Sequence, residues 1–209
     1  MKKMRSGVML AAMALALGWA APAMSEEAGS GGAPLGAAVA SEQQKHAKSV
    51  TLAPFTLNGV EVTQDRGRAM LDAFKSPENR KCKPFCVQPK SIDGATTVEV
   101  DDFAKMADEI NSGKTLIVDM RTPAWYAKGT LPGAISLPYT DLTGKKTKAK
   151  AKIKKLKGKN LIAFCNGWWC GQSPTGIRAL VEFGYEGKIY YFRGGSQDWA
   201  DAGLAFVTP

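Results

Sequence analysis

Histidine is nearly absent from this sequence, because His46 is the one histidine among 209 residues. It lies in a segment, residues 26–50, that is rich in Gly, Ala, Ser and Gln and has few large apolar residues. We therefore expect a flexible linker at 26–50 and an incidental, exposed His46. The composition excludes catalysis by a fixed histidine base, and it leaves a metal site short of ligands, so we expect no metal.

Long apolar runs are also scarce. The run from Val8 to about Ala21 follows a basic N-terminus and leads into small residues around Ala23 and Ser25. This layout predicts a secretory signal peptide at 1–25 and export to the periplasm. No cysteine lies there, which argues against a lipoprotein, while an uncleaved anchor helix stays open as an alternative.

The formal net charge of +9 is local rather than general. An acid-free run holds a large share of the basic residues, and the chain has no nucleic-acid motif with interleaved aromatics, so we expect no nucleic-acid partner. A solvated lysine-rich loop and helix is one interpretation, and docking to an acidic protein or a membrane surface is the other. The run, at 145–159, contains Lys145, Lys146, Lys148, Lys150, Lys152, Lys154, Lys155, Lys157 and Lys159.

Four cysteines form two close pairs, Cys82/Cys86 and Cys165/Cys170. Cys82/Cys86 belongs to an N-terminal extension, residues 51–95, whose segment FTLNGVEV predicts a hairpin turning at Asn58-Gly59. Export favours a local disulfide between Cys82 and Cys86, and a thiol-exchange pair or a metal site are the alternatives.

From residue 96 to 209 the pattern alternates between strands and helices. TTVEV, TLIVD, GAISLP, NLIAF and KIYYF read as strands, and a helix is expected from about Asp101 to Asn111. A second helix, Pro174 to Phe183, has Ser173 as its expected N-terminal cap. This alternation predicts an α/β domain with a parallel sheet covered by helices.

Cys165 directly follows the strand LIAF, at the sheet edge where ligands of α/β proteins gather. Backbone N–H groups of the turn and the start of the next helix favour a thiolate there. Cys165 is thus a candidate nucleophile that needs no histidine.

Three segments resemble, in order, the landmarks of the rhodanese-like, single-domain sulfurtransferases. LIVDMRTPAWYAKGTLPGAISLP is similar to the family's Asp-x-Arg segment and the turn after it, with Thr130 where histidine is usual. LIAFC ends at the position of the family's catalytic cysteine, and YYFRGGSQDWADAGL is similar to the closing segment. The likeness implies a rhodanese-like parallel sheet flanked by helices on both faces.

The resemblance implies that a Cys165 thiolate takes sulfur from a small anionic donor such as thiosulfate and passes it, as a persulfide, to a thiol or a cyanide-like acceptor. No cofactor is implied. Asp119 and Arg121 are implied to be scaffold. The substrate-binding loop would comprise Asn166, Gly167, Trp168, Trp169, Gly171, Gln172 and Ser173.

The loop departs from the family, because it is longer than usual and carries no charge. Arg178 and Arg193 are candidates to supply that charge, or else make surface salt bridges. Cys170 is either a resolving thiol or half of a structural disulfide with Cys165. Trp168 and Trp169 either wall the pocket or pack elsewhere. The alternatives to a sulfurtransferase are a thiol-disulfide redox protein using Cys165/Cys170 and a non-catalytic rhodanese-like binding module.

Overall fold

The computed structural model describes residues 42–69 and 86–209, which belong to one compact unit. The expected signal peptide at 1–25 lies outside the described residues, as does Cys82. Export and the Cys82/Cys86 disulfide therefore stay predictions.

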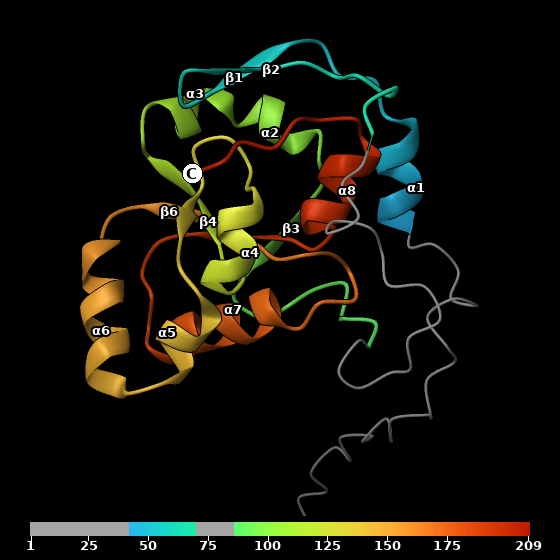
Figure 1. Cartoon of the computed structure of the whole chain (residues 1–209). Coiled ribbons are helices and arrows are strands. Elements are labelled where there is room, and N and C mark those ends of the chain that lie inside the picture. The colour runs from blue at the N-terminus through green and yellow to red at the C-terminus, as the bar shows by residue number, and fades with distance from the viewer. Residues whose placement is uncertain (1–41, 70–85) are drawn as a thin grey trace, which may run out of the picture. The chain divides into compact units, whose positions relative to one another are not determined.

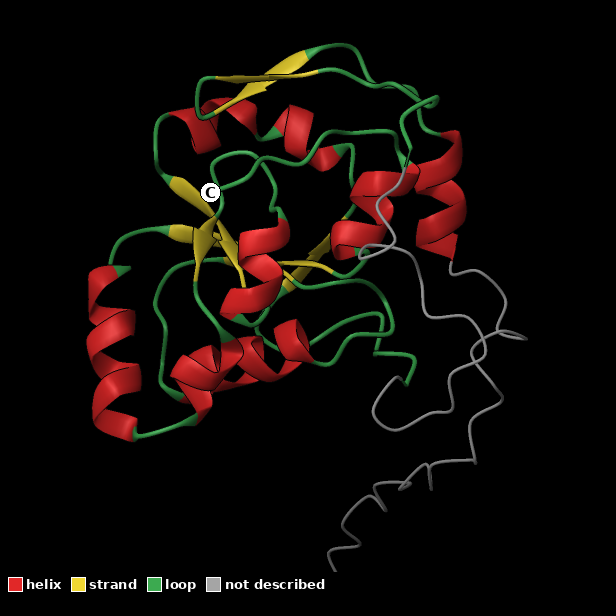
Figure 2. Cartoon of the chain, viewed as in Figure 1, coloured by secondary structure: helices red, strands yellow, loops and turns green. Residues whose placement is uncertain are grey.

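A five-stranded parallel sheet forms the centre of the unit, as the sequence predicts (Figures 1 and 2). The two inner strands with the longest apolar runs, β4 and β6, pair along their whole length. Such strands are buried on both faces, which is why their sequences do not alternate. In spatial order the strands are β3 (Thr96–Val98), β7 (Ile189–Phe192), β6 (Asn160–Phe164), β4 (Thr115–Asp119) and β5 (Ile135–Ser136).

Helices cover both faces of the sheet, and successive strand residues enter two different cores. Ile117 and Ile162 join the first core, whereas their neighbours Val118 and Ala163 join the second. Helix α4 (Pro123–Lys128) follows β4. The first core takes residues from α2 (Asp102–Lys105), α3 (Ala107–Asn111) and α8 (Gly195–Asp201), and the second from α5 (Tyr139–Thr143), α6 (Lys146–Lys155) and α7 (Gln172–Glu182).

The single helix expected from about Asp101 to Asn111 is divided in two. Met106 has φ −96° and ψ 4°, which takes it out of the helix between α2 and α3. Phe103 from the first piece and Ile110 from the second are both buried in the first core. Core packing, rather than local propensity, determines this geometry.

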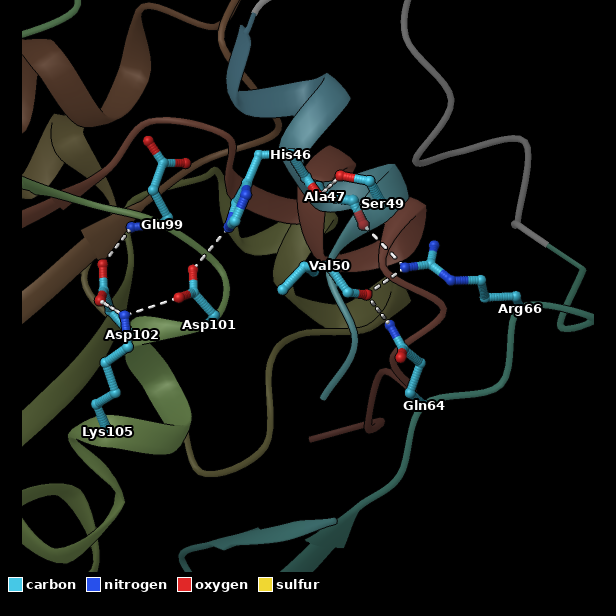
Figure 3. Close-up of polar contacts among 10 residues, drawn as sticks. All are labelled: His46, Ala47, Ser49, Val50, Gln64, Arg66, Glu99, Asp101, Asp102 and Lys105. Atoms are coloured by element: carbon cyan, nitrogen blue, oxygen red, sulfur yellow. Dashed lines mark hydrogen bonds and ion pairs between the residues drawn. The ribbon is translucent and has the colours of Figure 1, made fainter. Parts of the chain in front are cut away.

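The flexible linker expected at 26–50 is wrong for its last part. Residues Glu42–Ser49 form helix α1, which packs against α8. Ala47 is completely buried in the first core, and His46 makes a 2.8 Å contact with the Asp101 carboxylate (Figure 3). His46 is therefore not an incidental exposed residue. The prediction failed because α1 is held by one small apolar residue and by specific polar bonds, which composition does not reveal.

The chain after α1 is anchored by polar contacts and the predicted hairpin. Arg66 and Gln64 both donate to the Val50 carbonyl (Figure 3). Strands β1 (Phe55–Leu57) and β2 (Val60–Val62) pair antiparallel, and Asn58 and Gly59 between them have positive φ, 49° and 80°. This is the turn geometry that an Asn-Gly pair favours.

Helix α6 carries much of the predicted lysine-rich run on the surface. Ala149 is its buried residue, while Lys148 and Lys152 both pair with Asp141. Docking of this helix to an acidic partner stays a prediction. In the described ranges, no helix is long and apolar enough to cross a bilayer.

We expect Ala47→Leu to lower the free energy of unfolding by about 1–3 kcal/mol, because extra methyl groups do not fit a filled core. Lys45→Leu adds the same side chain at an exposed position of α1 and should have little effect. Urea denaturation measures both, and equal effects of the two substitutions would contradict the docking of α1.

Candidate active site

The predicted loop lies at the carboxyl end of the inner strand β6. It runs from Cys165, directly after Phe164, to Gly171, and α7 begins at Gln172. Every residue from Leu161 to Cys170 is buried. The loop is thus part of the interior rather than an open turn.

The Cys165 sulfur is 1% exposed and has polar neighbours on both sides. The Ser173 hydroxyl donates to Sγ at 3.0 Å, and in the neutral thiol form Sγ donates to the Cys170 carbonyl at 3.1 Å. Ser173 was expected to cap a helix beginning at Pro174. Helix α7 instead begins at Gln172, so Ser173 lies within it, and no side chain caps the helix. The hydroxyl contacts the thiol instead, so the predicted cap is wrong.

Hydrogen bonds lower the pKa of the Cys165 thiol in spite of burial. Burial opposes ionisation, but the Cys170 thiol and the hydroxyl and N–H of Ser173 donate to the sulfur, and so does the N–H of Gly167. Together they bring the pKa from 9.0 to about 7. No arginine or lysine is among these causes. Neutral donors thus produce the thiolate.

Cys165 and Cys170 are both free thiols. The hydrogen bond from Cys170 to the Cys165 thiolate keeps the Cys170 proton in place, and with burial it raises the pKa of Cys170 well above 9.0. A purely structural disulfide, which the sequence left open, is therefore not the state of this structure. The Cys165 sulfur thus ionises more readily than an ordinary thiol, whereas the Cys170 sulfur keeps its proton.

Trp168 and Trp169 pack on the thiols. They are 4% and 6% exposed and form one buried cluster with Cys165 and Cys170. A methyl group added at Gly167 would lie 2.9 Å from the Trp169 indole nitrogen, so the indole lies close against the loop backbone. The structure thus places both tryptophans beside the thiols, and their role as walls of a substrate pocket stays a prediction.

The turn before α8 holds the other side of the loop. The N–H of Ser196 donates to the Cys165 carbonyl, and that of Gln197 to the Asn166 carbonyl, both at 2.9 Å. Gly195 has φ 55°, and a Cβ there would lie 2.1 Å from the Cys165 oxygen. The loop backbone is therefore fixed by contacts that only a glycine at 195 permits.

Asp119 and Arg121 form a completely buried ion pair beside the loop. Arg121 Nη2 donates to Asp119 at 2.6 Å and to the Gly129 carbonyl at 2.6 Å. Thr130, at the family's usual histidine position, donates to Asp119 at 2.8 Å. Arg121 Nη1 reaches Asn166 of the loop at 3.3 Å. This geometry is that of scaffold, as the resemblance implied.

The two arginines considered as charge support are placed differently. Arg178 is exposed on α7. Arg193 is 3% exposed, and its guanidinium donates to the Gln88 and Pro89 carbonyls of the extension at 2.7–3.1 Å. Arg193 thus anchors the extension.

The extension crosses the loop, a contact that the sequence did not predict. The Gln88 N–H donates to the Trp168 carbonyl at 2.9 Å. A methyl group placed on Gly171 would lie 3.6 Å from the Gln88 amide nitrogen. No sequence signal points to Gln88, because this is a backbone contact between distant segments, which leaves no residue pattern.

Several buried donors near the thiols have no hydrogen-bond partner among the described residues. They are the Trp168 indole N–H and the hydroxyls of Tyr191 and Ser196. Burial, and then the charge of Cys165, raises the pKa of Tyr191, so its hydroxyl keeps its proton. Unpartnered buried donors are costly unless a ligand or water satisfies them.

Residues 102–202 match the family model of the rhodanese-like domain. The chain is 28% identical over 111 residues to a sulfurtransferase of Allochromatium vinosum, covering 53% of this chain and 95% of that protein. It is also 28% identical over 102 residues to an HTH-type transcriptional regulator of Mycobacterium tuberculosis, covering 48% of this chain and 41% of the regulator.

A solved thiosulfate sulfurtransferase from Pseudomonas aeruginosa is 21% identical, with a TM-score of 0.45, over 54% of this chain and 20% of that chain. The chain thus spans less than half the length of the regulator and of this solved protein. The family model and the parallel sheet carry the assignment: this chain contains a rhodanese-like domain.

We expect the Cys165 thiolate to increase as pH rises, with half-ionisation at about pH 7. Ser173→Ala removes a donor to the thiolate, so its pKa should rise and the thiolate fraction at neutral pH fall several-fold, since hydrogen bonds to charged groups contribute about 1.5–3 kcal/mol. Ultraviolet absorbance of the thiolate follows the titration. Ser196→Ala, which removes a buried hydroxyl without a partner, should leave the midpoint in place; an unmoved midpoint in Ser173→Ala would refute the role of Ser173.

We expect Arg121→Ala to lower the free energy of unfolding by about 3–5 kcal/mol, because it leaves the Asp119 carboxylate buried without its partner. Lys114→Ala breaks the exposed ion pair with Glu109 and should change stability little. Chemical denaturation compares them, and similar small losses in both would show that the buried pair is not a structural requirement.

Proposed function

We propose that this protein transfers sulfane sulfur through a persulfide on Cys165. The observation that carries the proposal is the buried Cys165 thiol at the end of β6, with hydrogen-bond donors that lower its pKa to about 7. A thiolate at neutral pH is the nucleophile that this chemistry needs. The rhodanese-like domain and the similarity to a sulfurtransferase support the same class.

With thiosulfate as donor, the Cys165 thiolate attacks the outer sulfur. A new S–S bond forms, the donor's S–S bond breaks, and sulfite leaves with the electron pair. In the second step a nucleophile such as cyanide or a thiolate attacks the outer sulfur of Cys165–S–S⁻. Cys165 leaves as the thiolate, and the starting state is restored.

The pocket is suited to an anion although its loop carries no charge. The Gly167 and Ser173 N–H groups and the Ser173 hydroxyl already favour negative charge on sulfur. The unpartnered donors of Trp168, Tyr191 and Ser196 are available to donor oxygens or to the outer persulfide sulfur. Preorganised neutral donors in a buried site stabilise charge well.

A second candidate function, thiol-disulfide exchange, has its own supporting observation. Cys165 and Cys170 are free, and Cys170 hydrogen-bonds to the Cys165 thiolate. In this chemistry the Cys165 thiolate attacks an external disulfide, which releases one thiol and leaves a mixed disulfide on Cys165. Cys170 then attacks the Cys165 sulfur, which releases the second thiol and forms a Cys165–Cys170 disulfide. Two thiols of the protein are oxidised, and the external disulfide is reduced to two thiols.

We also propose that the protein works in the periplasm, on the strength of the signal-peptide layout of residues 1–25. The lysine run at 145–159 is proposed to bind an acidic protein or an anionic membrane surface. Its support is the exposure of most of these lysines.

Intact-mass spectrometry after thiosulfate treatment of the gently reduced protein tests the function. We expect a gain of one sulfur atom in the wild type and in Cys170→Ser, and none in Cys165→Ser. That pattern would identify both the persulfide and its carrier.

Other outcomes favour the alternatives. A change of two hydrogens with redox state, without any sulfur gain, would replace sulfur transfer by dithiol exchange at Cys165/Cys170. No mass change in any variant would leave a non-catalytic binding module.

A further inference from the structure

A short segment of the extension lies against the loop that carries the two thiols. This strap, Cys86–Pro89, precedes β3 by only a few residues, yet it makes its main contacts with the loop after β6 and with the end of β7. The Gln88 N–H donates to the Trp168 carbonyl, so a backbone hydrogen bond joins the strap directly to the loop.

Arg193 holds the strap from the other side. Its Nε donates to the carbonyls of Gln88 and Pro89, both at 3.1 Å, and Nη2 donates to Gln88 at 2.7 Å. Arg193 precedes the Gly194-Gly195 turn, whose successor Ser196 binds the Cys165 carbonyl. The segment from Arg193 to Ser196 therefore contacts both the Cys165 backbone and the strap.

The Gln88 side chain also lies against the loop. Its amide nitrogen donates to the Cys86 carbonyl at 2.8 Å, which folds the strap on itself, and the amide group lies next to Gly171. Beside this segment, Cys165 and Cys170 are 1% and 7% exposed. A reactive cysteine normally needs more access than this.

We infer that the strap is a size filter that restricts Cys165 to small donors and acceptors. Small inorganic anions and small thiols reach the sulfur through local fluctuations of the strap, whereas a bulky thiol or a protein acceptor requires the strap to be displaced. The consequence for substrates rests on the proposed function, but the restriction on access to Cys165 does not.

Alkylation rates test the filter in the full-length, gently reduced protein. The probes are iodoacetamide as the small reagent and a polyethylene-glycol maleimide as the bulky one, with modification at Cys165 resolved by fragmentation mass spectrometry. Arg193→Gln removes the guanidinium that holds the strap. We expect it to raise the bulky-to-small rate ratio about tenfold, because opening of a local unit limits access to buried groups.

Lys150→Gln is the matched control, since it removes an exposed cation of α6, a helix with no hydrogen bond to the strap among the described residues. A second pair separates the filter from misfolding. Gln88→Pro deletes the N–H that binds Trp168, whereas Gln88→Ala keeps it. The rate ratio should rise more in Gln88→Pro than in Gln88→Ala, which loses the side-chain amide but keeps the N–H to Trp168.

An unchanged ratio in both Arg193→Gln and Gln88→Pro would overturn the inference. So would an equal acceleration with both reagents, because that indicates general loosening of the fold. Alkylation needs no sulfur donor, so failure to form a persulfide leaves this result intact, and the two proposals fail separately.

Discussion

The buried ion pair of Asp119 and Arg121 is the interaction on which the site depends. Arg121 uses its guanidinium to join the end of β4, the Gly129 carbonyl and Asn166 of the loop. Removing two charges from water is costly, and a pair of this kind is retained only if its remaining donors and acceptors are satisfied. Here the Thr130 hydroxyl donates a further hydrogen bond to the Asp119 carboxylate. The pair thus sets the relative positions of two strand ends, and the loop is held in that frame.

Within this frame the protein prepares a thiolate without a cation in its loop. Burial alone would raise the pKa of Cys165, and hydrogen bonds reverse that effect. In the proposed reaction, these neutral, fixed donors would stabilise the charge as it moves from Cys165 to the outer sulfur of a persulfide, without a change of counter-ion. Neither arginine that was considered as charge support is among the causes that lower this pKa. Arg193 binds the extension, and Arg178 is exposed.

The extension is part of the site rather than an appendage to the domain. Gln88 contacts the loop, and helix α1 with the β1–β2 hairpin completes the first core through Ala47, Leu57 and Val62. The contact between Gln88 and the loop is the basis of our inference that the extension limits access to Cys165.

The sequence by itself determined the parallel sheet, the hairpin and the position of Cys165 after an inner strand, because apolar runs and an Asn-Gly turn are local signals. It also identified Asp119, Arg121 and the loop residues as candidates. Only the tertiary structure decided that Ser173 binds sulfur rather than capping α7, that α1 begins at Glu42, and that Gln88 bonds to the loop backbone. The Gln88 contact in particular rests on backbone carbonyls and N–H groups brought together from distant segments. Every residue carries such groups, so no residue type marks where they will meet.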